Sequence, residues 1–183
     1  MAGVFERSAL TAKGIALMAK AGAGLCTITF TQAATGDGTY TDGEDLSVKT
    51  ALKSQKQSFQ IKTVTVHNAS NVFVQFVMTN HQTGGDLQTG YNVKEIGIFA
   101  TDPDEGEILY SIAVVSDDKC DYMPPYNNVM PSTIIVDYLT EVANTSSVSI
   151  EAPNQMFIYD DETGTKYVFG IQNGNVYYEE ADA

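Results

Sequence analysis

The sequence predicts a mainly β (α+β) protein: an antiparallel β-sandwich-like domain with one N-terminal helix, plus a small C-terminal β-hairpin module. Three observations lead to this prediction. Apolar residues at helical spacing form one clear helix pattern, within residues 8–24. Alternation of apolar and polar residues, typical of half-buried strands, recurs through most of the remaining chain. Near the C-terminus an Asn-Gly pair separates two short apolar runs, which is the pattern of a two-residue hairpin.

The composition allows a hydrophobic core and excludes some classes of partner. Of 183 residues, 43% are hydrophobic and 18% are charged, a balance typical of folded domains. The formal net charge is −13. Nucleic acids and anionic membranes both attract Lys and Arg, so we expect neither among the partners. The N-terminal residues lack the apolar segment of a signal peptide, so we expect synthesis and folding in a cytoplasm.

The predicted helix lies within residues 8–24. Its apolar face consists of residues at helical spacing: Leu10, Gly14, Leu17, Met18 and Ala21. Ser8 or Thr11 can cap its N-terminus, because a hydroxyl can accept a hydrogen bond from a free backbone N–H. Gly22 or Gly24 can end it. We expect the apolar face to pack against the core or another subunit.

The strands follow the helix. Seven alternating segments are predicted as strands: 25–32, 59–68, 71–80, 91–101, 107–116, 132–142 and 146–152. Residues 33–45 are predicted to form a polar loop, and residues 46–58 can hold a short helix. Residues 117–128 are predicted to be irregular, because Pro124-Pro125 is incompatible with a central strand.

The strands at 91–101 and 107–116 are apolar on both faces near the turn that joins them. Ile96 and Ile98 lie on one face of the first strand, and Phe99 lies on the other. Strands that are buried on both sides have this composition. The pattern predicts either a sandwich core or a surface that another subunit covers.

Glu95 is a carboxylate within this apolar strand. A buried carboxylate needs a partner or it becomes neutral. We expect Glu95 to form a structural ion pair or to lie in a subunit interface rather than to act in catalysis. The predicted set of packing or subunit-interface residues is Leu10, Leu17, Glu95, Ile96, Ile98 and Phe99.

The acids between these two strands are predicted to form a turn rather than a metal site. A calcium loop of the EF-hand type needs Gly at position 6 and Glu at position 12, whereas counting from Asp102 places Gly106 fifth and Ala113 twelfth. Asp-Pro followed by Asp-Glu-Gly is typical of a tight turn. With residues 102–106 as the loop, the expected opposite pairs are Thr101 with Glu107, Phe99 with Leu109, Gly97 with Ser111, and Glu95 with Ala113. The loop at 36–45 is also acidic but has no defined ligand spacing, so a solvated loop is favoured over calcium binding.

No arrangement typical of a catalytic or cofactor site is present. The chain lacks a G-x-S-x-G motif, a P-loop and a Cys–His pattern. His67 and His81 are expected to lie roughly 20 Å apart, too far to share a zinc ion. Cys26 and Cys120 are too few for a disulfide framework. A two-carboxylate glycosidase stays open, since any two acids can approach each other in a fold. We expect no cofactor and no metal.

The last thirty residues are predicted to form a separate module, which gives domains at 1–152 and 153–183. Asn173-Gly174 lies between two strand-like runs, as in a type I′ hairpin. A lone hairpin is marginal in water. We therefore expect this one to pack on residues 155–159, on the first domain, or on another copy of the chain.

Three segments, in this order and spacing, resemble the N-terminal domain of phage tail-collar fibre proteins. The segments are LTAKGIALMAKAGAGLCTITFTQAATGDGTY (10–40), GYNVKEIGIFATDPDEGEILYSIA (90–113) and DYMPPYN (121–127). The family pattern has a Leu-Thr-x-x-Gly helix, a strand ending in Gly-Asp-Gly, and a Glu-Ile-Gly-Ile/Leu-Phe-Ala strand with an Asp-Pro turn. The resemblance covers roughly residues 8–150. The final hairpin is similar to short appendages at the C-termini of other phage tail proteins.

The resemblance implies a non-enzymatic structural protein of a phage tail or related contractile apparatus. Family members dock on the baseplate, usually as homotrimers, and a shaft and receptor-binding tip follow. Here a small hairpin module follows instead, so we expect a short adaptor that attaches a fibre to the baseplate. The implied partners are other tail or baseplate proteins and a separate fibre chain. The implied location is the virion tail, assembled in the host bacterial cytoplasm.

Two alternatives stay open at this point. The first is a receptor- or glycan-binding tail-tip protein, in which Tyr167, Tyr177 and Tyr178 contact a host glycan. The second is a cell-wall-degrading enzyme, which only unassigned acids support.

Overall fold

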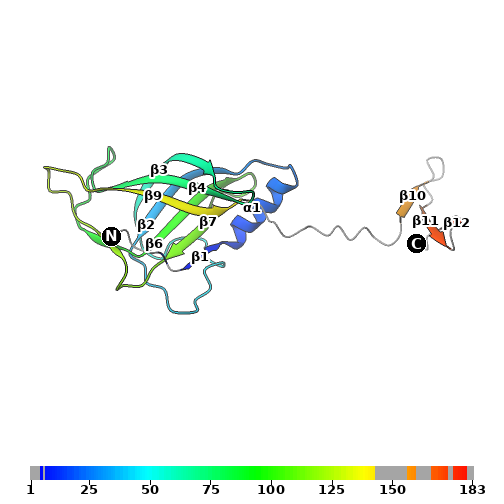
Figure 1. Ribbon diagram of the computed structural model, residues 1–183, viewed down its shortest axis with the longest axis horizontal. Coiled ribbons are helices and arrows are strands. Elements are labelled where there is room, and N and C mark those ends of the chain that lie inside the picture. Colours follow the sequence, from blue (N-terminus) through cyan, green and yellow to red (C-terminus); the bar gives the residue numbers. More distant parts are fainter. Residues whose placement is uncertain (1–4, 6, 143–155, 160–165, 173–174, 181–183) are drawn as a thin grey trace. The chain divides into compact units, whose positions relative to one another are not determined.

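The computed structural model describes residues 5, 7–142, 156–159, 166–172 and 175–180, with side chains up to residue 142 (Figure 1). The chain divides into two compact units, Met1–Thr145 and Ser146–Ala183. The described residues form twelve strands and one α-helix. The predicted mainly β fold with one N-terminal helix is therefore confirmed.

Seven strands of the first unit form one antiparallel sheet in the order β1-β7-β6-β2-β3-β4-β9. Their bounds are β1 Arg7–Leu10, β2 Thr29–Gly36, β3 Gln55–Val66, β4 Asn71–Thr79, β6 Glu95–Asp102, β7 Gly106–Val114 and β9 Thr133–Glu141. The sheet curls, so that β9 at one end of this order approaches β7 near the other end (Figure 1). Across this approach the Tyr138 hydroxyl of β9 and the Ser111 hydroxyl of β7 are hydrogen-bonded at 3.1 Å.

The main hydrophobic core lies on the concave face of the curled sheet. Val74 and Phe76 of β4 and Tyr138 of β9 belong to the same buried cluster as Ile96 and Ile98 of β6. Residues of β4 alternate between buried and half-buried along its whole length, which confirms the predicted alternating strand. Opposite ends of one sheet therefore supply the two layers around the core.

The convex face of β2, β6 and β7 is covered by residues 37–54, here called the covering segment. Leu46 and Leu52 of this segment pack in one cluster with Leu109 and Ile112 of β7. The chain itself therefore buries the second apolar face of these strands.

The short helix predicted within residues 46–58 is absent, so that prediction is wrong. Residues 46–54 form turns and bends, and residues 55–58 belong to β3. Leu46 and Leu52 are six positions apart, which would place them on different faces of an α-helix. The turns instead direct both side chains to the sheet.

Strand β2 begins and ends four residues later than predicted. Leu25, predicted to start the strand, precedes it and is 75% exposed. Ala33, Ala34 and Thr35, predicted as loop, are fully buried within β2. Alanine has a low strand propensity, but small side chains suit a central strand whose two faces are both covered.

Helix α1 spans Ala12–Gly22, and Thr11 is its N-cap. The Gly14 N–H donates to the Thr11 hydroxyl oxygen at 3.0 Å. The predicted cap and the predicted end at Gly22 are confirmed, whereas residues 8–10 are not helical. They belong to β1, which pairs with residues 111–114 of β7. Leu17 and Met18 of the helix are buried, as the predicted apolar face requires.

Strands β6 and β7 pair in the predicted register only near their turn. Thr101 lies opposite Glu107 and Phe99 opposite Leu109, as predicted. Beyond Phe99 the register shifts by one residue, so that Glu95 lies opposite Val114 instead of Ala113. Tyr110 is the extra residue of this β-bulge, which a count from the turn cannot reveal.

Two short strands, β5 (Tyr91–Val93) and β8 (Asp121–Met123), form a separate antiparallel pair. Lys94 separates β5 from β6, so the predicted strand at 91–101 is interrupted. Strand β8 lies within the segment predicted to be irregular, and it ends at Met123 just before Pro124.

The second unit contains a three-stranded antiparallel sheet in the order β10-β11-β12. Its strands are β10 Met156–Tyr159, β11 Lys166–Gln172 and β12 Asn175–Glu180. Gln172 pairs with Asn175, which is the register expected for a two-residue connection, and β10 pairs with β11. The strand predicted at 146–152 lies outside the described residues.

Candidate functional site

Glu95 is the centre of a buried hydrogen-bond network. Its Oε1 accepts hydrogen bonds from the backbone N–H groups of Gly38 at 3.1 Å and Ser54 at 2.8 Å. Its Oε2 accepts from the Lys53 N–H at 2.9 Å and from the Tyr40 hydroxyl. All four donors lie in the covering segment, so the carboxylate fixes that segment to the sheet. These donors are neutral groups and do not form an ion pair with Glu95.

Two glycines make room for this carboxylate. A Cβ atom on Gly36 would lie 2.4 Å from Glu95 Oε1, and one on Gly38 would lie 2.6 Å from the same oxygen. Burial, reinforced by the hydrogen bond to Glu95, raises the pKa of Tyr40 above its ordinary value. The Tyr40 hydroxyl therefore stays protonated and remains a donor. The network is closed within one chain and has the form of a structural clamp.

A second contact joins the start of α1 to the bulge in β7. The Thr11 hydroxyl donates to the Leu109 carbonyl oxygen, and the Thr11 N–H donates to the Tyr110 carbonyl oxygen at 3.0 Å. Gly14 lies against the same peptide group, because a Cβ there would be 2.1 Å from the Tyr110 oxygen. Only a residue without a side chain permits this approach.

The acidic turn holds the other end of α1. Lys20 Nζ lies 2.8 Å from both carboxylate oxygens of Asp102 and 2.8 Å from Asp104 Oδ2. The hydrogen bond from Lys20, with those from the Asp104 and Glu105 N–H groups, holds the pKa of Asp102 below its usual range. Glu105 forms an ion pair with Lys13. The acids of the predicted turn thus attach it to the helix. Within the described part of the chain, no group of three or more His, Cys, Asp and Glu side chains is placed to hold a metal ion.

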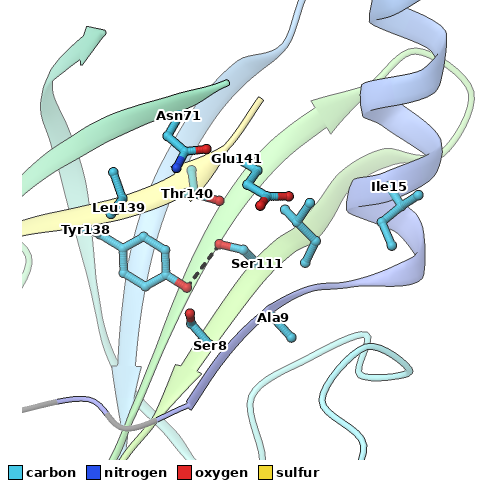
Figure 2. Close-up of a pocket in the computed structure, with 10 residues that line it drawn as sticks. Ser8, Ala9, Ile15, Asn71, Ser111, Tyr138, Leu139, Thr140 and Glu141 are labelled. Atoms are coloured by element: carbon cyan, nitrogen blue, oxygen red, sulfur yellow. Dashed lines mark hydrogen bonds between the residues drawn. The ribbon is translucent and has the colours of Figure 1, made fainter. Parts of the chain in front are cut away.

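A groove lies between the two end strands of the curled sheet. One part, about 470 Å³ in volume, is bounded by β1, β7, β9 and the helix (Figure 2). Its lining residues are Ser8, Ala9, Leu10, Ile15, Asn71, Ser111, Tyr138, Leu139, Thr140 and Glu141. Figure 2 shows the Tyr138 ring reaching from β9 toward Ser111.

The groove continues into a more apolar part of about 340 Å³. The two parts share Ser8, Tyr138 and Leu139. The floor of the second part includes Ile96 and Ala113 of the main core. This second part therefore lies over the concave core between β1 and β9, and Phe5 is among its lining residues. Sequence reasoning missed this site, because alternation identifies a strand but does not show that the strand is an edge.

The chain matches the family described as phage tail-collar fibre protein, N-terminal, over residues 1–158. The chain belongs to this family. A search of curated proteins and a search of solved structures each returned no match.

The segments that carry the resemblance to the tail-collar fibre family are those that hold this domain together. Thr11 and Gly14 of Leu-Thr-x-x-Gly contact the bulge of β7. Gly36 and Gly38 of the Gly-Asp-Gly segment surround the carboxylate of Glu95, which begins the Glu-Ile-Gly strand. These contacts are internal to the chain, so they account for the fold of this tail-collar fibre protein and not for its partner.

The predicted packing residues of this tail-collar fibre protein lie in its interior for the most part. Leu17, Glu95, Ile96 and Ile98 are at most 1% exposed. Phe99 is partly buried against the cluster under the covering segment, and Leu10 lies partly buried beside the groove. The fold of one chain thus explains their burial.

The predicted tyrosine cluster belongs to the second unit of this tail-collar fibre protein. Tyr167 is in β11, and Tyr177 and Tyr178 are in β12. Their side chains lie outside the described part of the structure. Among the described residues, no helix has the length and apolar character needed to cross a membrane.

Proposed function

We propose that this tail protein attaches a fibre to the baseplate of a phage tail or related contractile apparatus, as a short adaptor and as a homotrimer. The observation that carries the proposal is the family match, which spans the whole first unit and extends to residue 158. The role is structural and non-enzymatic. The adaptor resides in the virion tail at the baseplate, after assembly in the host bacterial cytoplasm.

The design of the first unit supports an attachment role. Buried acids and glycines are used to hold the helix and the covering segment on the sheet, as Glu95, Gly38 and Asp102 illustrate. A rigid, internally clamped sheet suits a part that transmits force between two assemblies. Exposed apolar side chains on the loop before β9 add contact surface, since Val129 is 83% and Met130 73% exposed.

The test is to add the purified chain to tail particles that lack fibres and to image them by electron microscopy. We expect added density at the baseplate, because the attachment site of such particles is vacant. Particles that retain their fibres are the control, and they should gain no density. Absence of added density on fibreless particles, with folded protein in excess, would contradict the proposed attachment.

A further inference from the structure

Among the described residues, no strand pairs with the edge of β9 that faces the groove. The Val142 N–H donates to the Ser70 carbonyl at 2.7 Å, and the Asn80 N–H donates to the Ser132 carbonyl at 3.3 Å. In an antiparallel ladder, hydrogen-bonded residues alternate with residues whose N–H and C=O point away from the partner strand. The odd-numbered residues from 133 to 141 therefore direct their backbone groups away from β4 and toward the groove. The Glu141 carbonyl oxygen is already occupied, because it accepts a hydrogen bond from the Tyr110 hydroxyl at 2.6 Å.

The edge of β1 faces the same groove in the same way. The Thr11 N–H bonds to Tyr110 of β7, and the register pairs Leu10 with Ser111 and Ser8 with Ala113. By the same alternation, Ser8 and Leu10 direct their N–H and C=O groups away from β7. Both residues line the groove.

The directions of β1 and β9 allow a single strand to pair antiparallel with both. Each neighbouring pair in the seven-stranded sheet is antiparallel. The first strand, β1, and the seventh, β9, therefore run in the same direction. A single strand that ran opposite to both would form two antiparallel ladders, which is the more stable pairing.

Several side chains that point inward at the groove are less buried than those in the middle of the sheet, although Phe5 packs against the core there. In the middle of the sheet Val74 and Phe76 are fully buried. At the β9 end of the same face, Ile134 and Val136 are only partly buried against the core. On the β1 side, Ser8 is exposed although its paired residue, Ala113, is 4% exposed. Apolar side chains from an inserted strand would complete this face.

The charges beside the groove favour basic residues on the outward face of an inserted strand. Asp137 and Glu141 are exposed residues of β9 whose backbone groups face the groove. Among the described contacts, Asp137 accepts a hydrogen bond from the neutral Gln75 amide at 2.8 Å, and neither acid is in an ion pair. Cross-strand pairs of opposite charge are favourable and pairs of like charge are not.

We propose that the groove between β1 and β9 binds an extended segment of a different polypeptide as an added β-strand. The segment runs antiparallel to both edges. Its apolar residues alternate inward onto the concave core, and its basic residues alternate outward beside Asp137 and Glu141. This mode of recognition is β-augmentation, in which main-chain hydrogen bonds give affinity and alternate side chains give specificity. The proposal rests on the geometry of the two strand edges and does not depend on where in the tail the protein docks.

The test is binding of a fluorescent seven-residue probe to the full chain, measured by anisotropy. The probe is acetyl-Lys-Val-Lys-Ile-Lys-Val-Lys-amide, which alternates apolar and basic residues. A peptide of the same composition with its apolar residues contiguous controls for attraction to a chain of net charge −13. We expect saturable binding of the alternating peptide only. Equal binding of both peptides, or of neither, overturns the proposal.

Charge exchange locates the peptide on the protein. In the double variant Asp137→Lys and Glu141→Lys, we expect roughly tenfold weaker binding of the basic probe, since two favourable cross-strand pairs become unfavourable. The matching probe with Glu in place of Lys should then bind the variant better than the native chain. Asp42→Lys, an exposed acid of the covering segment, is the matched control and should leave both affinities unchanged. An equal loss in the control variant overturns the assignment to the groove.

Backbone pairing has its own test. Leu139→Pro removes a backbone N–H that faces the groove. The hydrogen bonds between β9 and β4 keep all of their donors, so the fold is retained. We expect loss of probe binding with an unchanged circular dichroism spectrum. Retained binding in this folded variant would contradict strand addition. Light scattering with and without the probe tests another occupant: a fall in mass on addition of the probe would assign the groove to a second copy of the chain and overturn the proposal.

Discussion

At the scale of single residues, the domain depends on a buried carboxylate whose partners are backbone groups. Glu95 is fully buried and accepts four hydrogen bonds, three of them from N–H groups of the covering segment. Hydrogen bonds to a charged group contribute more than those between neutral groups. These hydrogen bonds attach the irregular covering segment to β6, although the two do not pair as strands.

We expect Glu95→Gln to destabilise the domain by about 2 kcal/mol, because an amide nitrogen cannot accept the hydrogen bonds that one carboxylate oxygen now accepts. Urea unfolding followed by circular dichroism measures this loss. The matched control is Glu107→Gln, since Glu107 is exposed and accepts from Thr31 and Gln32. There we expect a change within about 0.5 kcal/mol. Similar losses of stability in both variants would show that burial does not increase the contribution of Glu95.

The sequence showed that Glu95 was unusual but not what it bound. An acid within an apolar strand indicates a buried partner. The partners are main-chain N–H groups at residues 38, 53 and 54, and every residue type except proline carries such a donor. No side-chain pattern could have identified these donors, so the sequence predicted an ion pair or a subunit interface where the structure has backbone hydrogen bonds.

At the scale of elements, α1 is positioned by a glycine that touches β7. A Cβ on Gly14 would lie 2.1 Å from the Tyr110 carbonyl oxygen, which belongs to the backbone and cannot rotate away. A Cβ on Gly22, at the end of the same helix, would meet no atom from another part of the chain within 4 Å. The two glycines therefore form a matched pair of sites.

We expect Gly14→Ala to lower the free energy of unfolding by roughly 1–3 kcal/mol through overpacking. Gly22→Ala should be neutral or stabilising by up to about 1 kcal/mol, because alanine favours the helix. Thermal unfolding of the two variants and the native chain measures both effects. Destabilisation by Gly22→Ala to the same degree would mean that the contact with Tyr110 is not the cause.

The covering segment is also held by ion pairs that depend on pH. Hydrogen bonds from Lys49 and then Lys53 lower the pKa of Glu44 from 4.5 to about 2. The native state therefore binds fewer protons than the unfolded state between these values. The stability that Glu44 contributes is present above about pH 4.5 and is lost as the pH falls toward 2.

We expect the urea midpoint of Glu44→Gln to fall less between pH 6 and pH 3 than that of the native chain, because the variant has no carboxyl group to protonate there. Asp42→Asn, which removes an exposed neighbouring carboxylate, is the control and should keep the native acid sensitivity. If the urea midpoint of Glu44→Gln falls as much between pH 6 and pH 3 as that of the native chain, this account is contradicted.

Helix and strand positions were predicted correctly where local sequence determines them. The helix cap at Thr11 and the pairing of residues 99 and 101 next to the turn followed from local chemistry. The short strand β1 and the turns at 46–54 depend on contacts with β7 that are distant in sequence. The bulge at Tyr110 lies where the start of α1 contacts β7. Such tertiary contacts override local propensity.

At the scale of the whole molecule, the proposed homotrimer makes a direct prediction. Multi-angle light scattering of the purified chain at micromolar concentration should give three times the mass of one chain. The expectation rests on the resemblance that implied a homotrimer, and the exposed apolar residues Val64 and Val66 on β3 offer surface for association. Dilution series provide the control for weak association. A single species with the mass of one chain throughout the series would contradict the trimer.

The pairing of β1 with β7 has a consequence for how this protein emerges from the ribosome. Residues 7–10 have their partners at 111–114, and the cap residue Thr11 bonds to residues 109 and 110. The helix therefore cannot reach its native position until more than a hundred residues have been synthesised. Sheets built from such distant pairs fold slowly. The N-terminal residues, although made first, must wait for β7 before they can take their native places.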